Sequence, residues 1–310
     1  MGKTVKILLM LTLLISIGCF TLGIVLAQQA GMTIQDLAKL VQSNLEEINI
    51  SPVTQEYSAI QETLSLTEQA DKPHIVIRNT FPDVTITEGD EFKVELLGEV
   101  SSKLDHLLSW SADLDTIYIN IASVFNENPS STGLKALVTL PHALVDNVTI
   151  ESVSGDVTIS NGPVINHSQI QTKSGNVTIE DTQIYSLATT TVSGNLEATS
   201  FDDLVVDCVS VSGDLNLAID SLSGRLKSES GRISTQISDL HNDLLLENES
   251  GAIAVIYDGD GFNYELSSNS GRLTVNREVF EHQVTVESIQ NSYLLKATTT
   301  TGYVNLKFEP

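Results

Sequence analysis

A hydroxyl-glycine repeat limits what this chain can fold into more than any other feature of its sequence. A repeat of about 20 residues, marked by a serine or threonine followed by glycine, occurs eight times between 150 and 308. The glycines are Gly155, Gly175, Gly194, Gly213, Gly231, Gly251, Gly271 and Gly302. The last interval is longer than the others, and we expect it to contain one degenerate turn around 284–288. The other intervals are roughly 20 residues, a length that indicates a stack of equivalent structural units.

Apolar positions within the repeat define its interior. The residue two positions after each glycine (+2) is aliphatic in all eight repeats, and the residues four after (+4) and five before it (−5) are mostly apolar. The residues at +1 and +3 vary in charge and size. This alternation predicts a strand directly after each glycine, with +2, +4 and −5 inside and +1 and +3 outside.

Two further positions predict polar ladders. Position −1 holds seven serines and Thr301, and position −3 holds Ser, Thr or Asn in every repeat. Both share the parity of the inward position −5, so we expect both sets to be buried and hydrogen-bonded, either to one another from coil to coil or to the backbone of a corner. The glycine stands where the parity changes, which predicts a bulge or a corner with positive φ.

The repeat therefore predicts an all-β fold, a single-stranded parallel (right-handed) β-solenoid with coils of about 20 residues. We place this β-strand repeat domain at 73–310, with regular coils from 150. Shorter alternating segments precede the regular coils, at 74–78, 84–86, 92–96, 116–121 and 134–140. The stretch 126–133 is the most loop-like.

Residues 1–27 predict a signal peptide or an N-terminal membrane anchor. Lys3 and Lys6 precede a long segment without a charge, 7–27. Its length favours a membrane helix, whereas the small residues before Gln28 favour cleavage after Ala27, and lipidation of Cys19 is a third option. The basic N-terminus is expected to stay in the cytoplasm, which places the rest of the chain at the cell membrane or cell surface, or outside the cell if the segment is cleaved.

Residues 28–72 predict a short helical spacer. Ile34, Leu37, Val41 and Leu45 recur at helical spacing, which favours one amphipathic helix over 34–48. A weaker helical segment is expected at 58–69. The spacer is a juxtamembrane connection or a stalk that docks a partner.

The net charge of −24 excludes some partners. Lys3 and Lys6 are the only charges in the segment 1–27, so the rest of the chain carries −26. A chain this acidic repels phosphates, which argues against nucleic acid and anionic lipid headgroups as partners. The simplest interpretation of the negative charge is an acidic surface that is solvated and has no specific partner.

We expect no catalytic, cofactor-binding or metal-binding residues and no cofactor. The histidines at 74, 106, 142, 167, 241 and 282 lack ligand spacing. Cys208 stands at an inward position, which favours a buried, inert thiol. The acidic residues 202, 203 and 207 and the Asp-Gly-Asp-Gly stretch at 258–261 are more typical of loops than of a calcium site.

A polysaccharide-active β-helix enzyme is disfavoured. Such enzymes need clustered carboxylates with a basic partner. Between 136 and 224 the only basic residue is Lys173, and the coils have no long insertions to build a cleft.

Several segments carry a resemblance to a known family. Val138-Thr-Leu-Pro141 is followed by VTIESVSGDVTI at 148–159, and SVSGD recurs at 210–214. With TKSGNV at 172–177 and TVSGNL at 191–196, the chain resembles, over roughly 74–310, the bacterial putative-adhesin family of β-strand repeat proteins. That group of unknown function is related to toast-rack and autotransporter-head-like solenoids. The resemblance implies a right-handed β-helical envelope protein with no established catalytic residues, whose members are linked to adhesion or envelope stress.

The chain departs from the family pattern after some glycines. Arg232, Ala252 and Arg272 replace the usual acidic or amide residue at +1, so a uniform acidic ladder is not expected in the C-terminal half.

The sequence leaves three functional hypotheses open. The first is a non-enzymatic cell-envelope protein that presents a rigid solenoid for adhesion or scaffolding, with an envelope or surface protein or a glycan as partner, or with self-association. The second is a membrane-anchored sensory or regulatory partner in envelope-stress signalling, and the third is the enzyme. The sequence does not identify the ligand.

Overall fold

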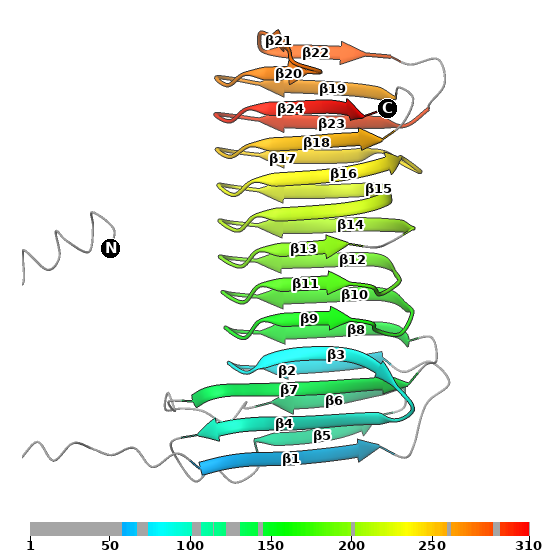
Figure 1. The fold of residues 1–310 in the computed structure, drawn as a ribbon, viewed down its shortest axis with the longest axis vertical. Helices are drawn as coiled ribbons and strands as arrows, with labels where there is room; N and C mark the ends of the chain where they lie inside the picture. The colour runs from blue at the N-terminus through cyan, green and yellow to red at the C-terminus, as the bar shows by residue number, and fades with distance from the viewer. Residues whose placement is uncertain are drawn as a thin grey trace, which may run out of the picture. The chain divides into compact units, whose positions relative to one another are not determined.

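The part of the chain that the structure describes is all-β, and its 24 strands form one hydrogen-bonded, mostly parallel sheet (Figure 1). The computed structural model describes residues 58–66, 74–100, 107–113, 115–121, 131–141, 145–199, 202–258, 262–287 and 292–309. They belong to a unit that extends from Glu56 to Pro310. The predictions for 1–57 lie outside the described residues, and no helix within the described ranges is long and apolar enough to span a bilayer.

Each regular repeat contributes one strand to each of two parallel stacks, joined at the Ser-Gly corner. The first stack contains the strands that lead into the corner, and the second contains the strands that leave it. In spatial order the first stack comprises β5 (Leu108–Asp113), β6 (Thr116–Ile121), β2 (His74–Asn79), β8 (Val145–Ser152), β10 (Ile165–Thr172), β12 (Ile184–Thr191), β14 (Asp203–Ser210), the C-terminal half of β15 (Leu215–Ser228), β17 (Leu244–Asn248), β23 (Leu294–Thr299), β19 (Asn263–Ser268) and β22 (Gln283–Val286).

The second stack runs alongside in the same order of repeats. It comprises β1 (Ser58–Leu66), β4 (Phe92–Val100), β7 (Ser131–Pro141), β3 (Asp83–Gly89), β9 (Val157–Ser160), β11 (Val177–Glu180), β13 (Leu196–Thr199), the N-terminal half of β15, β16 (Ile233–Asp239), β18 (Ile253–Asp258), β24 (Val304–Glu309), β20 (Leu273–Val275) and β21 (Glu278–Phe280). We call one strand pair, with its corner, a rung.

The pairing register confirms the predicted interior. Ile170 lies between Ile150 and Thr189 in the first stack, and Val177 lies between Val157 and Leu196 in the second, so equivalent repeat positions stack directly. Every residue at +2, +4 and −5 is buried. Alternation with period two thus placed the apolar side chains correctly along both strands of the repeat.

Close backbone approach explains the glycine at each corner. A Cβ atom on Gly213 would lie 1.8 Å from the carbonyl oxygen of Gly194, and one on Gly175 would lie 2.0 Å from that of Gly155. The prediction of a positive φ was wrong, because among the described residues the glycines with positive φ are Gly98, Gly133 and Gly224. The repeat glycine is required by the carbonyl of the neighbouring rung.

The order of rungs departs from chain order at both ends of the stack. At one end the rung of β2 and β3 lies between that of β6 and β7 and that of β8 and β9. At the other end the C-terminal rung of β23 and β24 lies between that of β17 and β18 and that of β19 and β20. Figure 1 shows the red C-terminal rung enclosed by orange and yellow ones.

Antiparallel strands close both ends, which corrects two predictions. The turn expected at 284–288 is not a parallel coil, because β22 pairs antiparallel with β19 over its described residues. The weak helix expected at 58–69 is wrong over its described part, since β1 pairs antiparallel with β4 along its whole length. The five strands expected upstream of the regular coils all form, although Ser131–Gly133 of the expected loop belong to β7.

Candidate binding groove

A row of buried polar side chains runs under the corner at position −3, as predicted. We call it the hydroxyl row; it comprises the eight −3 residues Ser152, Thr172, Thr191, Ser210, Ser228, Asn248, Ser268 and Thr299, together with Asn79, which pairs with Ser152 in the stack. Ser210 shows the pattern: its Oγ lies 2.8 Å from the backbone nitrogen of Gly213, 2.9 Å from the carbonyl oxygen of Gly213, and 3.1 Å from Oγ1 of Thr191. These bonds satisfy the buried hydroxyls and hold the corner in a fixed shape.

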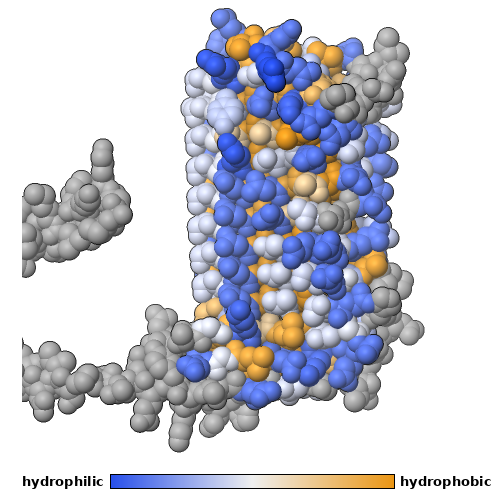
Figure 2. Space-filling model, viewed as in Figure 1, coloured by the Kyte–Doolittle hydropathy of each residue, from blue (hydrophilic) through white to orange (hydrophobic). Residues whose placement is uncertain are grey.

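The ladder expected inside the stack at position −1 lies outside it. All eight −1 side chains are exposed, and each donates its hydroxyl proton to a backbone carbonyl of the neighbouring rung, as Ser212 does to Val192 at 3.0 Å. The reason is that the strand ends at −3, so the chain turns and the alternation stops before the glycine. These corners form the left edge of the stack in Figure 1 and a pale column of intermediate hydropathy in Figure 2.

A second row of polar side chains, on the outer surface at position +1, was not recognised from the sequence. The side-chain Oδ1 of Asp156 accepts from the backbone nitrogen of Asn176 at 2.7 Å, and the same contact passes from rung to rung through Asn176, Asn195 and Asp214. The row ends where Arg232 replaces the acidic or amide residue at +1. The recurring Asp or Asn at +1 was the signal that could have revealed it.

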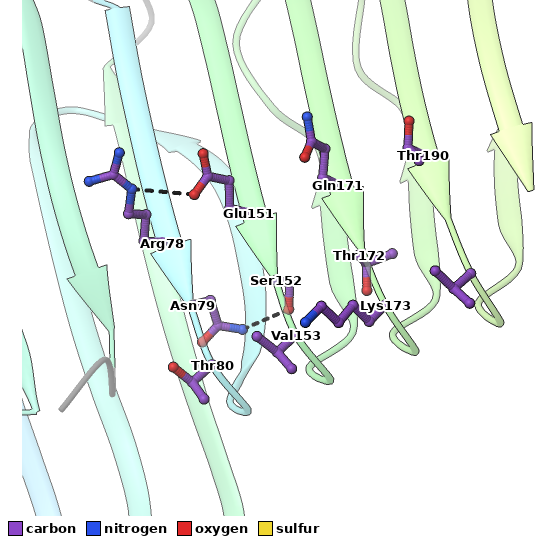
Figure 3. A pocket seen from close by; sticks show the side chains of 11 residues that line it. Arg78, Asn79, Thr80, Glu151, Ser152, Val153, Gln171, Thr172, Lys173 and Thr190 are labelled. Atoms are coloured by element: carbon purple, nitrogen blue, oxygen red, sulfur yellow. Dashed lines mark hydrogen bonds and ion pairs between the residues drawn. The ribbon is translucent and has the colours of Figure 1, made fainter. Parts of the chain in front are cut away.

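A shallow groove lies over the hydroxyl row on the outer face of the first stack. Side chains at −4 form one wall and side chains at −2 form the other. Its N-terminal part has a volume of about 360 Å³ and is lined by Arg78, Asn79, Thr80, Glu151, Ser152, Val153, Gln171, Thr172, Lys173, Thr190 and Val192. Figure 3 shows these side chains projecting from the ends of adjacent strands.

The same groove recurs further along the stack. A second hollow of about 250 Å³ is lined at the equivalent repeat positions by Lys227, Ser228, Glu247, Asn248, Glu249, Ser267, Asn269, Thr298, Thr299 and Thr300. Val209 and Val211 occupy positions −4 and −2 on the intervening rung. The two hollows therefore lie at equivalent repeat positions on either side of the β14 rung, and we call them together the groove, which extends from β2 to β19.

The two walls of the groove differ in chemistry along its length. Val153 and Val192 are 42% and 49% exposed, which gives the N-terminal stretch an apolar wall. In the C-terminal stretch Glu249 and Asn269 stand at position −2 instead. Arg78 and Glu151 stand on neighbouring rungs and form an ion pair, with 3.3 Å between Nε and Oε2, a contact drawn in Figure 3.

Most of the residues that the sequence excluded from chemistry are dispersed in the structure. His74, His167, His241 and His282 lie in separate places, and 106 and 142 lie outside the described residues. Cys208 is fully buried, and burial raises the pKa of its thiol from 9.0 to about 12. Within the described ranges no three His, Cys, Asp or Glu side chains are grouped so that they could hold a metal ion. Residues 259–261 of the Asp-Gly-Asp-Gly stretch are outside those ranges.

The fold brings together one polar cluster that the sequence did not reveal. Ser221 Oγ contacts His241 Nδ1, and His241 Nε2 lies 3.6 Å from Asp203 Oδ1. Asp239 Oδ2 lies 3.9 Å from Nδ1. The side chains of His241 and both aspartates are 57–60% exposed, so water screens their charges and the pairing contributes little to stability.

The fold and the groove together define a class of protein: a parallel β-repeat module that carries a groove on its outer face. The match to a family model is specific: residues 73–307 match the family described as Toastrack DUF4097, and the chain belongs to that family. No curated protein matches the chain.

Several solved structures similar to this chain carry adhesion-related names, and one is named as a lipid binding protein. A putative adhesin from Bacteroides fragilis NCTC 9343 has a TM-score of 0.50 at 14% identity, over 81% of this chain and 97% of that chain. A putative cell adhesion protein from Clostridium sporogenes ATCC 15579 is 12% identical over 81% of this chain and 100% of that one, with a TM-score of 0.27. A putative lipid binding protein from Parabacteroides distasonis ATCC 8503 is 13% identical over 79% and 96%, with a TM-score of 0.33. The TM-score of 0.50 for the Bacteroides fragilis protein, at 14% identity, shows a shared fold and nothing about function.

Proposed function

We propose that this protein is a non-enzymatic binding protein of the cell envelope, which presents the groove to an extended partner. The observation that carries the proposal is the groove itself. It crosses successive rungs over a floor of buried side chains that are hydrogen-bonded to the corner backbone, and its walls present a different pair of side chains at each rung. A rigid surface of this kind suits an elongated ligand that contacts several rungs at once.

The proposal includes the arrangement of the whole chain. Residues 1–27 would export or anchor the protein, 28–57 would form a spacer, and the sheet from β1 onward would be the binding domain outside the cytoplasm. Lys3 and Lys6, which stand before the uncharged segment 7–27, support this orientation. We also infer that each repeat makes one coil of a right-handed parallel solenoid, because connections between parallel strands of one sheet are almost always right-handed.

A retention assay tests the groove as the binding surface. Full-length protein in lipid nanodiscs is mixed with isolated cell envelopes, and the sedimented fraction is measured. Val192→Arg should reduce retention, because it places a large charged side chain on the apolar wall. Val205→Arg is the matched control, since Val205 is 54% exposed in the same stack and does not line either hollow.

The two outcomes separate groove binding from other modes of attachment. Loss with the Val192 variant alone supports the proposal. Equal retention of wild type and both variants would contradict it and would favour attachment through the N-terminal segments, as the regulatory hypothesis requires.

A further inference from the structure

The N-terminal stretch of the groove carries an unmatched positive charge. Its lining has two cationic residues, Arg78 and Lys173, and one acidic residue, Glu151. Arg78 already pairs with Glu151. Lys173 is exposed, and no other residue of the described part of the chain forms an ion pair with its ammonium group. A protein of net charge −24 thus keeps one free cation among the described residues of this stretch.

The position of Lys173 places this cation between two apolar side chains. It stands at −2, directly after β10 ends, in the rung between those of Val153 and Val192, and Figure 3 shows its side chain extending toward Val153. Gln171 and Thr190 on the opposite wall are exposed and supply an amide and a hydroxyl. The stretch therefore combines one positive charge, neutral hydrogen-bonding groups and two small apolar surfaces.

The strands beneath this stretch offer a ligand no backbone edge. β2, β8, β10 and β12 are each paired on both sides. A peptide cannot add to them as a further strand, so main-chain pairing, the common mode of recognising extended peptides on sheets, is closed here. Recognition has to use the side chains.

We propose that the groove binds an acidic polysaccharide, with Lys173 pairing with a carboxylate of a uronic-acid unit. This inference rests on the proposed function and names its ligand class. Sugar rings offer C–H surfaces to valines, hydroxyls to Gln171 and Thr190, and a carboxylate to Lys173. The open, shallow form of the groove accepts an internal segment of a chain.

The net negative charge of the protein does not prevent this binding. At physiological ionic strength the screening length is about 8 Å, so a carboxylate in the groove responds chiefly to charges within that distance. No aromatic ring is among the described residues that line this stretch, so charge and hydrogen bonds carry the recognition. Added salt should therefore weaken the complex.

The test measures affinity of full-length protein in nanodiscs for an oligogalacturonate of defined length and for its methyl ester, which has the same backbone without the charges. Wild type should prefer the acid form. Lys173→Gln should weaken binding of the acid about tenfold or more, in line with a lost charge-assisted hydrogen bond, and should bring it to the level of the ester. Lys135→Gln, at an exposed position on β7 of the other stack, is the matched control and should bind like wild type.

Several results would overturn the inference. They are equal affinity for acid and ester, equal affinity of wild type and Lys173→Gln, and tighter binding of a polyglutamate of equal length, which would identify an acidic polypeptide as the ligand class. Failure to bind either sugar into the millimolar range also rejects it. The envelope-retention assay with Val192→Arg is independent of these sugars, so the proposed function can stand when this inference fails.

Discussion

Replacing Gly213 with alanine should destabilise the stack far more than its small size suggests. The new Cβ would lie 1.8 Å from the carbonyl oxygen of Gly194, whereas real Cβ contacts stay above 3.0 Å, so the two rungs must move apart. Ser212 N donates to Val192 O at 3.0 Å and Leu196 N donates to Asp214 O at 2.8 Å across the same gap. A separation of roughly 1 Å takes both bonds beyond hydrogen-bonding distance.

The expected loss follows from those bonds. Two backbone bonds at about 1 kcal/mol each, with the strain of the displaced corner, amount to about 3 kcal/mol. Gly133→Ala is the control: Gly133 has a φ of 60° and no atom within 4 Å of the position that a methyl group would take, so only the conformational cost of about 1 kcal/mol applies. Hydrogen exchange at the amides of Ser212 and Leu196, with urea midpoints, measures both variants.

Equal losses for the two variants would refute the steric reasoning. So would unchanged exchange protection of Ser212 and Leu196 in the Gly213 variant, because the rungs would then have accepted the methyl group without separating. Urea midpoints are compared between variants only, since long repeat arrays do not always unfold in a single step.

Further substitutions test the polar rows and the buried thiol. Ser210→Val should lower the free energy of unfolding by about 2 kcal/mol, because it leaves buried partners of the hydroxyl row unsatisfied. Ser212→Val, on the exposed corner, should lower it by less than about 1 kcal/mol in the same thermal melts. A larger loss for the Ser212 variant would contradict the burial assignment. Asn195→Ala removes the acceptor for the backbone nitrogen of Asp214, so the free energy of unfolding measured by urea denaturation should fall by about 1 kcal/mol. Asn195→Asp keeps an acceptor oxygen and should retain most of the stability. Because burial raises the pKa of Cys208 from 9.0 to about 12, the unfolded chain releases this proton first, and stability should fall as pH rises above 9. Iodoacetamide should label the Cys208 peptide only under denaturing conditions, and mass spectrometry showing rapid labelling of the native protein would contradict this.

The sequence predicted the interior of the stack well because one periodicity governs it. Residues such as Val177 and Ile170 alternate with exposed neighbours, and the parallel register repeats the alternation rung after rung. The hydroxyl row was found by the same count. Ser212 was misplaced because parity can be counted only along a continuous strand, and β14 ends at Ser210.

Long-range pairing decided what periodicity could not. Ile60 and Leu64 are four positions apart, which suits one face of a helix and equally one face of a strand, and antiparallel pairing with β4 selects the strand. The insertion of β2 between β6 and β8 has no local signal, since Ile77 presents the same apolar face to Ile119 and to Ile150. The groove was not predicted either, because its walls come from exposed positions whose residue types vary between repeats.

The displaced rungs at the two ends determine where the protein can change length. The rung of β23 and β24 is held on both sides, and antiparallel β22 closes the stack beyond it. A repeat added after residue 309, or before residue 74, would meet no free parallel strand to continue. Duplication or deletion of a whole repeat is compatible with the fold only between β8 and β18, where chain order and spatial order agree. Lengthening there would extend the groove by whole rungs and leave both ends unchanged.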